Sequence, residues 1–355
     1  MNDIYTIHKD EMTPRERMIA YATGKDIDRI PCNPFLGECL APIFGHTVRE
    51  YHHNPDILVD VNIKGFEKFR GDSVAIGPGL SGIPEAMGSH LVYPENSTPI
   101  VKSGAIVDYS ELSKLEPIDM RNAGRVTNCI ESLKKLQEAI GKEVFVGTSV
   151  GGPFTAAAFL RGTDIFLRDL TKHREEVHKL LEIATQSVLN YIDAACDLGI
   201  APSLAEPTAS GTLISAKNFE EFAQPYIKRC ADRIRERTGS GLTIHICGKS
   251  KKIWGNMIAA GATSISLDNA EDINDLKEAY GDKVTIVGNI DPVNVIYLGE
   301  VEDIYNAAEQ CIIKGKDNPR GHILASGCAV PIGTKAENIQ AVVDAARIFG
   351  STKNI

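Results

Sequence analysis

The segment Leu242-Thr243-Ile244-His245-Ile246-Cys247-Gly248 has the pattern of a short apolar β-strand that ends at a glycine. Because residues two apart in a strand point to the same face, the side chains of His245 and Cys247 are expected to project side by side. A second apolar segment, Ile323-Leu324-Ala325-Ser326-Gly327-Cys328, also ends in a cysteine. Two thiolates and one imidazole form a ligand set of catalytic zinc that leaves one position open. We therefore interpret His245, Cys247 and Cys328 as a candidate zinc site.

Strand-like and helix-like segments alternate along most of the chain. We predict eight strands, at 32–36, 74–76, 144–149, 202–206, 242–247, 264–268, 284–289 and 322–327. Apolar residues at helical spacing predict helices that include 183–196, 219–234, 304–313 and 339–349. This alternation indicates an α/β fold with a parallel sheet, and eight is the strand number of the closed (β/α)8 TIM barrel. The rival fold, an open doubly wound sheet, usually has a Gly-x-Gly-x-x-Gly turn after its first strand, and this chain has none there.

Residues 79–115 interrupt the alternation. They contain several glycines and prolines and only short apolar runs, which indicates an insertion after the second strand with a small hairpin. In a barrel such a loop lies over the active face. We expect residues 1–355 to form a single barrel domain. Near the start, Thr13-Pro14-Arg15-Glu16 has the cap residue, proline and later glutamate that are typical of the beginning of a helix.

The composition excludes several classes of function. The 355 residues are 43% hydrophobic and 24% charged, as in an ordinary globular protein. A net charge of −9 without a long basic run argues against nucleic acid as a partner. The longest run without a charged residue, 144–160, contains Gly151-Gly152-Pro153, so we expect a core strand and loop rather than a membrane span. Because Met1-Asn2-Asp3-Ile4 does not resemble the start of a secretory signal and no Cys-x-x-Cys pair occurs, we expect a reducing, cytoplasmic compartment.

Other polar residues lie at the carboxyl ends of predicted strands, where barrel enzymes place their active sites. Asp268 ends the sixth strand and is a candidate for a fourth zinc ligand or for a hydrogen-bond partner of a ligand. Glu206 ends the fourth strand and Asn289 lies at the end of the seventh, and we assign both to the substrate pocket. For each of these residues, a hydrogen bond to a neighbouring loop is the structural alternative.

The donor set favours activation of a thiol. A free thiol with a pKa of about 8.5 is only a few per cent thiolate at neutral pH, whereas a thiol that coordinates a metal is deprotonated. Zn²⁺ with two thiolates and one neutral imidazole has no net charge, so a bound substrate thiolate keeps more electron density than it would on a cationic centre. Zinc sites that activate water instead usually have three histidines, or two histidines and a glutamate.

Around these residues the chain resembles the uroporphyrinogen decarboxylase superfamily, and the resemblance spans nearly the whole length. The matching stretches are Glu16-Arg17, Asp28-Arg29-Ile30-Pro31, Gly151-Gly152-Pro153-Phe154-Thr155, Glu206-Pro207-Thr208-Ala209-Ser210-Gly211, Phe222 with Pro225-Tyr226, and Gly288-Asn289-Ile290-Asp291. Membership implies the (β/α)8 barrel. Within the superfamily, His245, Cys247 and Cys328 fit the His-x-Cys and distant Cys of zinc-dependent methyltransferases that act on methylated corrinoid proteins. The sequence is similar to that of the methylcobamide:coenzyme M methyltransferases, whose zinc binds the acceptor thiol.

That resemblance implies a zinc-dependent methyltransferase. It would move a methyl group from a methylated corrinoid protein to a thiol similar to coenzyme M, or to another acceptor such as a tetrahydrofolate. The chain does not contain the Asp-x-His-x-x-Gly signature of corrinoid-binding domains, so the corrinoid is expected to arrive on a partner protein. The identity of the acceptor and the direction of transfer in the cell stay open at this point.

Two other functions remain compatible with the superfamily. Its decarboxylases have an arginine-rich segment after the first strand that binds substrate carboxylates. Here the corresponding run, Asn33-Pro34-Phe35-Leu36-Gly37-Glu38-Cys39-Leu40-Ala41-Pro42, has no arginine and one acidic residue, which weakens the hypothesis of a carboxy-lyase. A non-catalytic member that binds a corrinoid protein is the second alternative.

Overall fold

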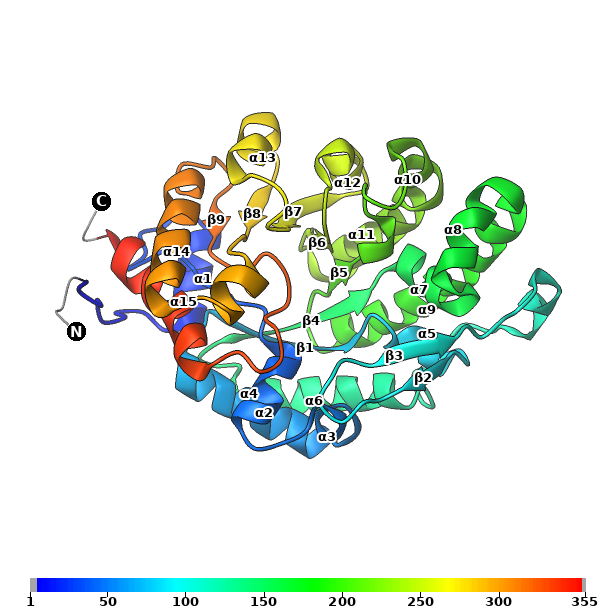
Figure 1. Cartoon of the computed structure of the whole chain (residues 1–355), viewed down its shortest axis with the longest axis horizontal. Coiled ribbons are helices and arrows are strands. Elements are labelled where there is room, and N and C mark those ends of the chain that lie inside the picture. The colour runs from blue at the N-terminus through cyan, green and yellow to red at the C-terminus, as the bar shows by residue number, and fades with distance from the viewer. Residues whose placement is uncertain (1–4, 353–355) are drawn as a thin grey trace. The chain divides into compact units, whose positions relative to one another are not determined.

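The structure, a computed structural model, describes residues 5–352 of the chain (Figure 1). Contacts divide these residues into two compact units. The first unit contains residues 5–75, 135–146 and 266–352, and the second contains residues 76–134 and 147–265. The expected single domain over 1–355 stays a prediction. Residues 1–4, on which the expectation about a secretory signal rests, lie outside the described residues.

Seven strands form one sheet in the order β1-β4-β5-β6-β7-β8-β9. Their bounds are Ser73–Gly79 (β1), Phe145–Gly151 (β4), Ser203–Ala205 (β5), Leu242–Ile246 (β6), Ala262–Leu267 (β7), Thr285–Val287 (β8) and His322–Ile323 (β9). The pairs β4–β5, β5–β6 and β8–β9 are parallel. Each of these strands overlaps one of the predicted segments, although β9 is much shorter than the predicted 322–327, and the α/β class with a parallel sheet is confirmed.

The first predicted strand, 32–36, is reduced to a single bridge. Cys32 pairs in parallel with Leu324, and the carbonyl of Cys32 accepts a hydrogen bond of 2.9 Å from the amide of Asp72. The segment therefore lies beside the chain that continues β9 and beside the residue that precedes β1. Pro31 and Pro34 flank this position, and a proline has no N–H to donate to a ladder, so regular pairing stops there.

Helices occupy most of the chain between the strands. The α-helices are α1 (Pro14–Ala22), α2 (Leu40–Ile43), α3 (Val48–His53), α4 (Pro55–Phe69), α5 (Gly82–Ala86), α6 (Arg125–Ile140), α7 (Pro153–Arg161), α8 (Thr163–Lys172), α9 (Arg174–Asp197), α10 (Ala216–Phe222), α11 (Gln224–Thr238), α12 (Trp254–Ala259), α13 (Ile273–Tyr280), α14 (Val301–Gly315) and α15 (Ala336–Phe349). Shorter helical turns are η1 (Gly37–Cys39), η2 (Tyr109–Lys114), η3 (Pro207–Ala209), η4 (Lys251–Ile253) and the π-helical η5 (Pro292–Tyr297).

Local sequence signals decide several helix ends. α1 begins as predicted, because the Thr13 hydroxyl accepts the N–H of Glu16 while the Glu16 carboxylate accepts the N–H of Thr13. The predicted helix 219–234 is instead two helices, α10 and α11, which are separated at Ala223. Pro225 causes this break, since it has no N–H for the carbonyl of Glu221 and its ring would clash with that carbonyl in a continuous helix.

The 79–115 insertion contains the predicted hairpin. β2 (His90–Val92) pairs antiparallel with β3 (Ile100–Ser103), and the two strands form a separate sheet. Most residues of both strands are exposed. The hairpin therefore contributes little to the hydrophobic core, which agrees with its interpretation as an insertion.

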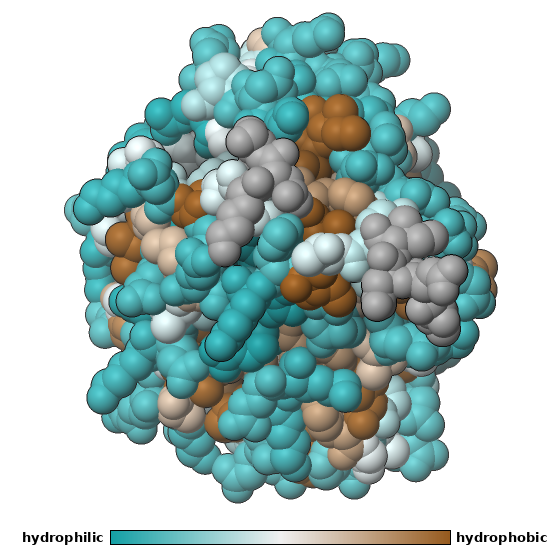
Figure 2. Space-filling model, turned by 90° about the vertical axis from the view of Figure 1, so that its left-hand side faces the viewer, coloured by the Kyte–Doolittle hydropathy of each residue, from teal (hydrophilic) through white to brown (hydrophobic). Residues whose placement is uncertain are grey.

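No helix among residues 5–352 is long and apolar enough to cross a bilayer. On the face drawn in Figure 2, hydrophilic residues cover most of the visible surface, and hydrophobic residues form small separate groups. Such a distribution is ordinary, because apolar atoms contribute roughly half of the surface of a folded protein.

A network of buried charges joins three segments of the first unit. Asp72 immediately precedes β1, and its carboxylate accepts hydrogen bonds from Arg17 at 2.5 Å and from Arg29 at 2.6 Å. The same carboxylate accepts the N–H of Cys32 at 2.7 Å. The side chains of Arg17 and Asp72 are 0% exposed and that of Arg29 is 2% exposed. Asp72 therefore ties α1 and the segment 32–36 to the start of β1.

His322 opens β9 and is buried in the neutral form. Its Nε2 lies 2.7 Å from the carbonyl oxygen of Gly288, so this nitrogen donates and carries the proton. The ring lies against Gly315 of α14, where a Cβ would be 2.3 Å from the imidazole, and this close approach requires glycine. Burial lowers the pKa of His322 to about 4, although the hydrogen bond to Gly288 acts in the opposite direction.

We expect this histidine to make the protein less stable in mild acid. In the unfolded chain His322 has its ordinary pKa of 6.5, against about 4 in the folded protein. The neutral ring therefore contributes its full stability above pH 6.5, and about 3 kcal/mol is lost as the pH falls towards 4. The free energy of unfolding, measured from pH 7 to pH 4, should fall less steeply for His322→Gln than for the wild type. The matched variant of an exposed histidine, His53→Gln, should keep the wild-type slope, and equal slopes for all three proteins would contradict this account.

Candidate metal centre

β6 positions the first two candidate ligands. Ile244 and Ile246 are buried, so the alternation of the strand places His245 on the opposite, partly exposed side. Cys247 follows the strand, and Gly248 turns the chain with a φ of +73°, which glycine adopts readily. The Nε2 atom of His245 lies 3.2 Å from the Sγ atom of Cys247. The two side chains thus lie side by side, as the two-residue spacing predicts.

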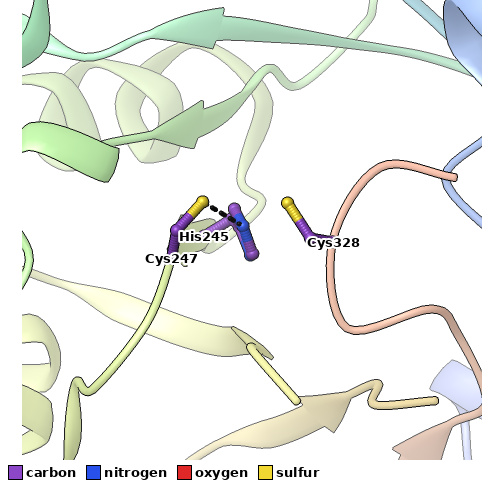
Figure 3. A group of neighbouring side chains, drawn as sticks. All are labelled: His245, Cys247 and Cys328. Atoms are coloured by element: carbon purple, nitrogen blue, oxygen red, sulfur yellow. Dashed lines mark hydrogen bonds between the residues drawn. The ribbon is translucent and has the colours of Figure 1, made fainter. Parts of the chain in front are cut away.

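The third candidate ligand, Cys328, lies in the loop after β9. One ligand atom from each of His245, Cys247 and Cys328 lies within 4.8 Å of the others (Figure 3). Two ligands of a tetrahedral zinc ion, with a nitrogen at about 2.1 Å and a sulfur at about 2.3 Å from the metal, are about 3.5 Å apart. The separation of 3.2 Å between His245 and Cys247 is close to that value. The donor set and its spacing therefore fit zinc.

Burial separates these two cysteines from the others in the chain. Cys247 and Cys328 are partly exposed, whereas six cysteines are buried: Cys32, Cys39, Cys129, Cys196, Cys230 and Cys311. Burial raises the pKa of the Cys32 and Cys39 thiols to about 12 and that of the Cys129 thiol to about 11. Such thiols stay protonated at neutral pH and serve as small apolar residues.

Glu206 is fully buried, and its carboxylate lies at the beginning of α7. It accepts the N–H of Phe154 at 3.0 Å, and the N–H and hydroxyl of Thr155 at 2.8 Å and 2.6 Å. Burial raises the pKa of Glu206 to about 7, although these hydrogen bonds lower it. Gly152 allows the close approach, since a Cβ there would be 2.2 Å from the carboxylate. The side chain thus holds the start of a helix, and its assignment to the substrate pocket stays a prediction.

Asp268 and Asn289 hold the loop after β7. One carboxylate oxygen of Asp268 accepts the N–H of Ala270 at 2.8 Å. The side-chain amide of Asn289 donates to the carbonyls of Asp268 at 3.1 Å and of Glu271 at 2.8 Å. The metal-capable group found among residues 5–352 does not include Asp268. Both side chains make the loop hydrogen bonds that were the structural alternative, and their roles in metal or substrate binding stay predictions.

Two hydroxyls that sequence reasoning did not assign hold the turn after Cys247. Ser210 Oγ donates to the carbonyl of Cys247 at 2.6 Å, and Thr212 Oγ1 accepts the N–H of Lys249 at 3.1 Å. The available signal was the small polar run Ser210-Gly211-Thr212 shortly after a strand. Such a run is equally typical of an ordinary surface loop, so it does not reveal which turn the hydroxyls contact.

A family model matches nearly the whole chain. The model described as uroporphyrinogen decarboxylase (URO-D) covers residues 13–349. The chain belongs to the URO-D family. A solved methyltransferase from Methanosarcina mazei superimposes with a TM-score of 0.81 at 25% identity, covering 95% of this chain and 98% of that one. This similarity confirms the TIM-barrel type of fold, which was predicted from the number of strands and expected for a member of this family.

Relatives within the URO-D family have two different activities. Methylcobamide:CoM methyltransferase MtaA from Methanosarcina barkeri is 26% identical over 343 residues, which are 94% of this chain and 98% of that protein. Uroporphyrinogen decarboxylase from Neisseria gonorrhoeae is 26% identical over 299 residues, 82% of each protein. The chain therefore belongs to a family of enzymes that contains both methyltransferases and decarboxylases.

Proposed function

We propose that this protein is a zinc-dependent methyltransferase that moves a methyl group from a methylated corrinoid protein to a thiol. The observation that carries the proposal is the group of His245, Cys247 and Cys328, whose ligand atoms lie within 4.8 Å of one another. The similarity to methylcobamide:CoM methyltransferase along nearly the full length of both proteins supports it. The acceptor belongs to the class of coenzyme M and related thiols, with a tetrahydrofolate as the alternative, and we place the reaction in the cytoplasm.

The three side chains have separate roles in this proposal. His245 and Cys247 form a fixed pair at the end of β6, and Cys328 completes the donor set from the loop after β9. When bound, zinc supplies a Lewis acid that keeps a coordinated thiol deprotonated at neutral pH. Two protein thiolates and a neutral imidazole balance the charge of the ion, so they preserve the electron density of a thiolate acceptor.

The reaction conserves charge without an added oxidant or reductant. The acceptor thiol gives up its proton, a sulfur–carbon bond forms, and the cobalt–carbon bond breaks with its electron pair left on cobalt. The corrinoid is a substrate that a partner protein delivers. Cys247 and Cys328 are partly exposed, as a donor group that meets a carried substrate requires. Buried thiols such as Cys39 do not meet this requirement.

Removal of the metal tests the proposal. Purified protein should contain about one zinc ion per chain, as expected for a three-ligand catalytic site. With methylcobalamin and a thiol as substrates, the protein should break the cobalt–carbon bond. The loss of methylcobalamin is measured by its absorbance. Treatment with a chelator should abolish this activity, and added zinc should restore it. A protein that holds zinc through His245, Cys247 and Cys328 and leaves methylcobalamin and the methylated carrier unchanged with every thiol tested would contradict methyl transfer.

A carboxy-lyase is the second candidate, and the similarity to uroporphyrinogen decarboxylase favours it. The segment that would bind substrate carboxylates contains Glu38, whose carboxylate lies 2.7 Å from His52 Nε2, and contains no arginine. An anionic substrate gains little from such a surface. Decarboxylation by this family member would continue after chelation of the metal, so the same experiment separates the two activities. A non-catalytic member would bind the carrier without any turnover.

A further inference from the structure

The loop between β5 and α10 contacts the turn that follows Cys247. It forms hydrogen bonds with the two peptide groups on either side of Gly248. Ser210 Oγ donates to the carbonyl of Cys247 at 2.6 Å, which belongs to the peptide before Gly248. Thr212 Oγ1 accepts the N–H of Lys249 at 3.1 Å, which belongs to the peptide after Gly248. The two hydroxyls thus hold both peptide planes on either side of the one residue that turns the chain.

The two hydroxyls are themselves connected. The N–H of Thr212 donates to Ser210 Oγ at 3.2 Å, so this oxygen donates one hydrogen bond and accepts another. Gly211 lies between them, and a Cβ at this position would be 2.6 Å from the carbonyl oxygen of Lys249. Glycine therefore allows the loop to approach the turn closely enough for both hydroxyls to reach it.

The loop has an independent anchor on the other side. Thr208 Oγ1 lies 3.0 Å from Thr155 Oγ1, and the Thr155 hydroxyl donates to the buried carboxylate of Glu206 at 2.6 Å. Ser210 is 3% exposed and Thr208 is 6% exposed, so these bonds are protected from water. The loop that holds the turn is therefore fixed to the beginning of α7.

We propose that Ser210 and Thr212 are positioning residues that preorganise the metal ligand Cys247 beside His245. This inference rests on the proposed function, because it assigns the pair a metal. Gly248 has a φ of +73°, and glycine reaches many backbone conformations at low cost, so the turn needs an external restraint to keep the Cys247 thiol 3.2 Å from the imidazole. Without the two hydroxyl contacts the chain must fix this geometry when the metal binds, which weakens binding.

Zinc affinity and cobalt spectroscopy test this role. We expect Ser210→Ala and Thr212→Val each to raise the dissociation constant for Zn²⁺ by about 10- to 100-fold, the range for partners that orient metal ligands. The constant is measured by competition with a chromophoric chelator. With Co²⁺ in place of zinc, the absorption bands that report tetrahedral thiolate coordination should weaken or shift in both variants. The conservative variant Thr212→Ser keeps the hydroxyl and should restore the wild-type constant and spectrum.

Ser215→Ala is the matched control. Ser215 and Thr212 are both exposed, and each hydroxyl accepts one backbone N–H, but Ser215 caps α10 through Asn218 whereas Thr212 contacts the turn through Lys249. This variant should lose a similar amount of stability and keep the wild-type affinity for zinc. Thr212 is exposed, so Thr212→Val should fold even where the buried change at Ser210 does not.

The outcomes separate this inference from the proposed function. If Ser210→Ala and Thr212→Val bind zinc as tightly as the wild type, or no more weakly than Ser215→Ala, the positioning role is overturned while the metal site stands. If the wild type binds no zinc, both proposals fall. A third outcome is that the wild type binds zinc, the two variants bind it more weakly, and no methyl transfer occurs. In that case the positioning role is supported and the proposed reaction alone fails.

Discussion

Replacement of Cys247 or Cys328 by serine should reduce the zinc content from about one ion per chain to a small fraction of that value. A hydroxyl is a much poorer zinc ligand than a thiolate, and the site has three protein donors to begin with. The rate of methyl transfer at pH 7 should fall at least about 30-fold, because an unassisted thiol with a pKa of about 8.5 is only about 3% thiolate at this pH. Metal analysis and the absorbance of methylcobalamin measure both effects.

A pH profile adds a second signature to the same variants. Where the metal is lost, the remaining slow transfer should rise between pH 7 and pH 9 as the free thiol ionises. The wild type should show little rise over this range. Cys196→Ser is the control, because Cys196 is a buried residue of α9 with a raised pKa. It should keep both zinc and activity, and a Cys247→Ser protein that still holds one zinc ion would show that the ligand assignment is wrong.

Replacement of Asp72 by alanine should destabilise the first unit strongly, by about 3 kcal/mol. The variant removes the carboxylate that the buried guanidinium groups of Arg17 and Arg29 share, and leaves Arg17 with Asp28 and Arg29 with Asp10. It also removes the acceptor for the N–H of Cys32, the residue through which the predicted strand 32–36 pairs with the sheet. Chemical denaturation followed by circular dichroism measures the change in the free energy of unfolding.

Asp60→Ala is the matched control for Asp72→Ala. Asp60 pairs with Lys64 one helical turn later, and both side chains are 48% exposed. Solvent screens such a pair, so its loss should change the stability by no more than about 0.5 kcal/mol. Similar losses for the two variants would mean that burial of the network around Asp72 contributes nothing beyond an ordinary surface ion pair.

The loss of zinc in Cys247→Ser and the loss of stability in Asp72→Ala concern residues at different ends of their strands. Asp72 and Cys32 lie where strands begin, and their network stabilises the fold. Cys247 lies after the last residue of β6, where a barrel carries its chemistry. Stability and proposed function are therefore separable by mutation. In the metal-free proteins, Cys247→Ser should change the free energy of unfolding little, whereas Asp72→Ala should lower it with or without metal.

Much of the fold could be predicted because it depends on local patterns. Seven predicted strands overlap observed ones, since alternating apolar residues and terminal glycines mark strands without reference to the remaining chain. The capped start of α1 is local in the same sense. The segment 32–36 is the exception, because its apolar content predicts a strand while Pro31 and Pro34 limit the hydrogen bonds that it can make.

The candidate site was only partly predictable. The spacing of His245 and Cys247 was sufficient to expect them side by side, because neighbouring positions of one strand have a fixed relation. Glu206, Asp268 and Asn289 also lie near strand ends, yet their side chains bind the start of α7 and the loop after β7. Beyond the end of a strand the alternation no longer applies, so the direction of a side chain depends on the loop.

Short stretches of residues were enough to predict the succession of strands and helices and the adjacent pair of ligands on one strand, because both follow from local periodicity. Three other features depend on tertiary packing: a ligand atom of Cys328 lies within 4.8 Å of those of the pair, Asp72 pairs with two buried arginines, and Ser210 and Thr212 hold the turn at Gly248. These contacts join residues far apart in the chain. Their existence depends on how strands and loops pack, which no short segment encodes.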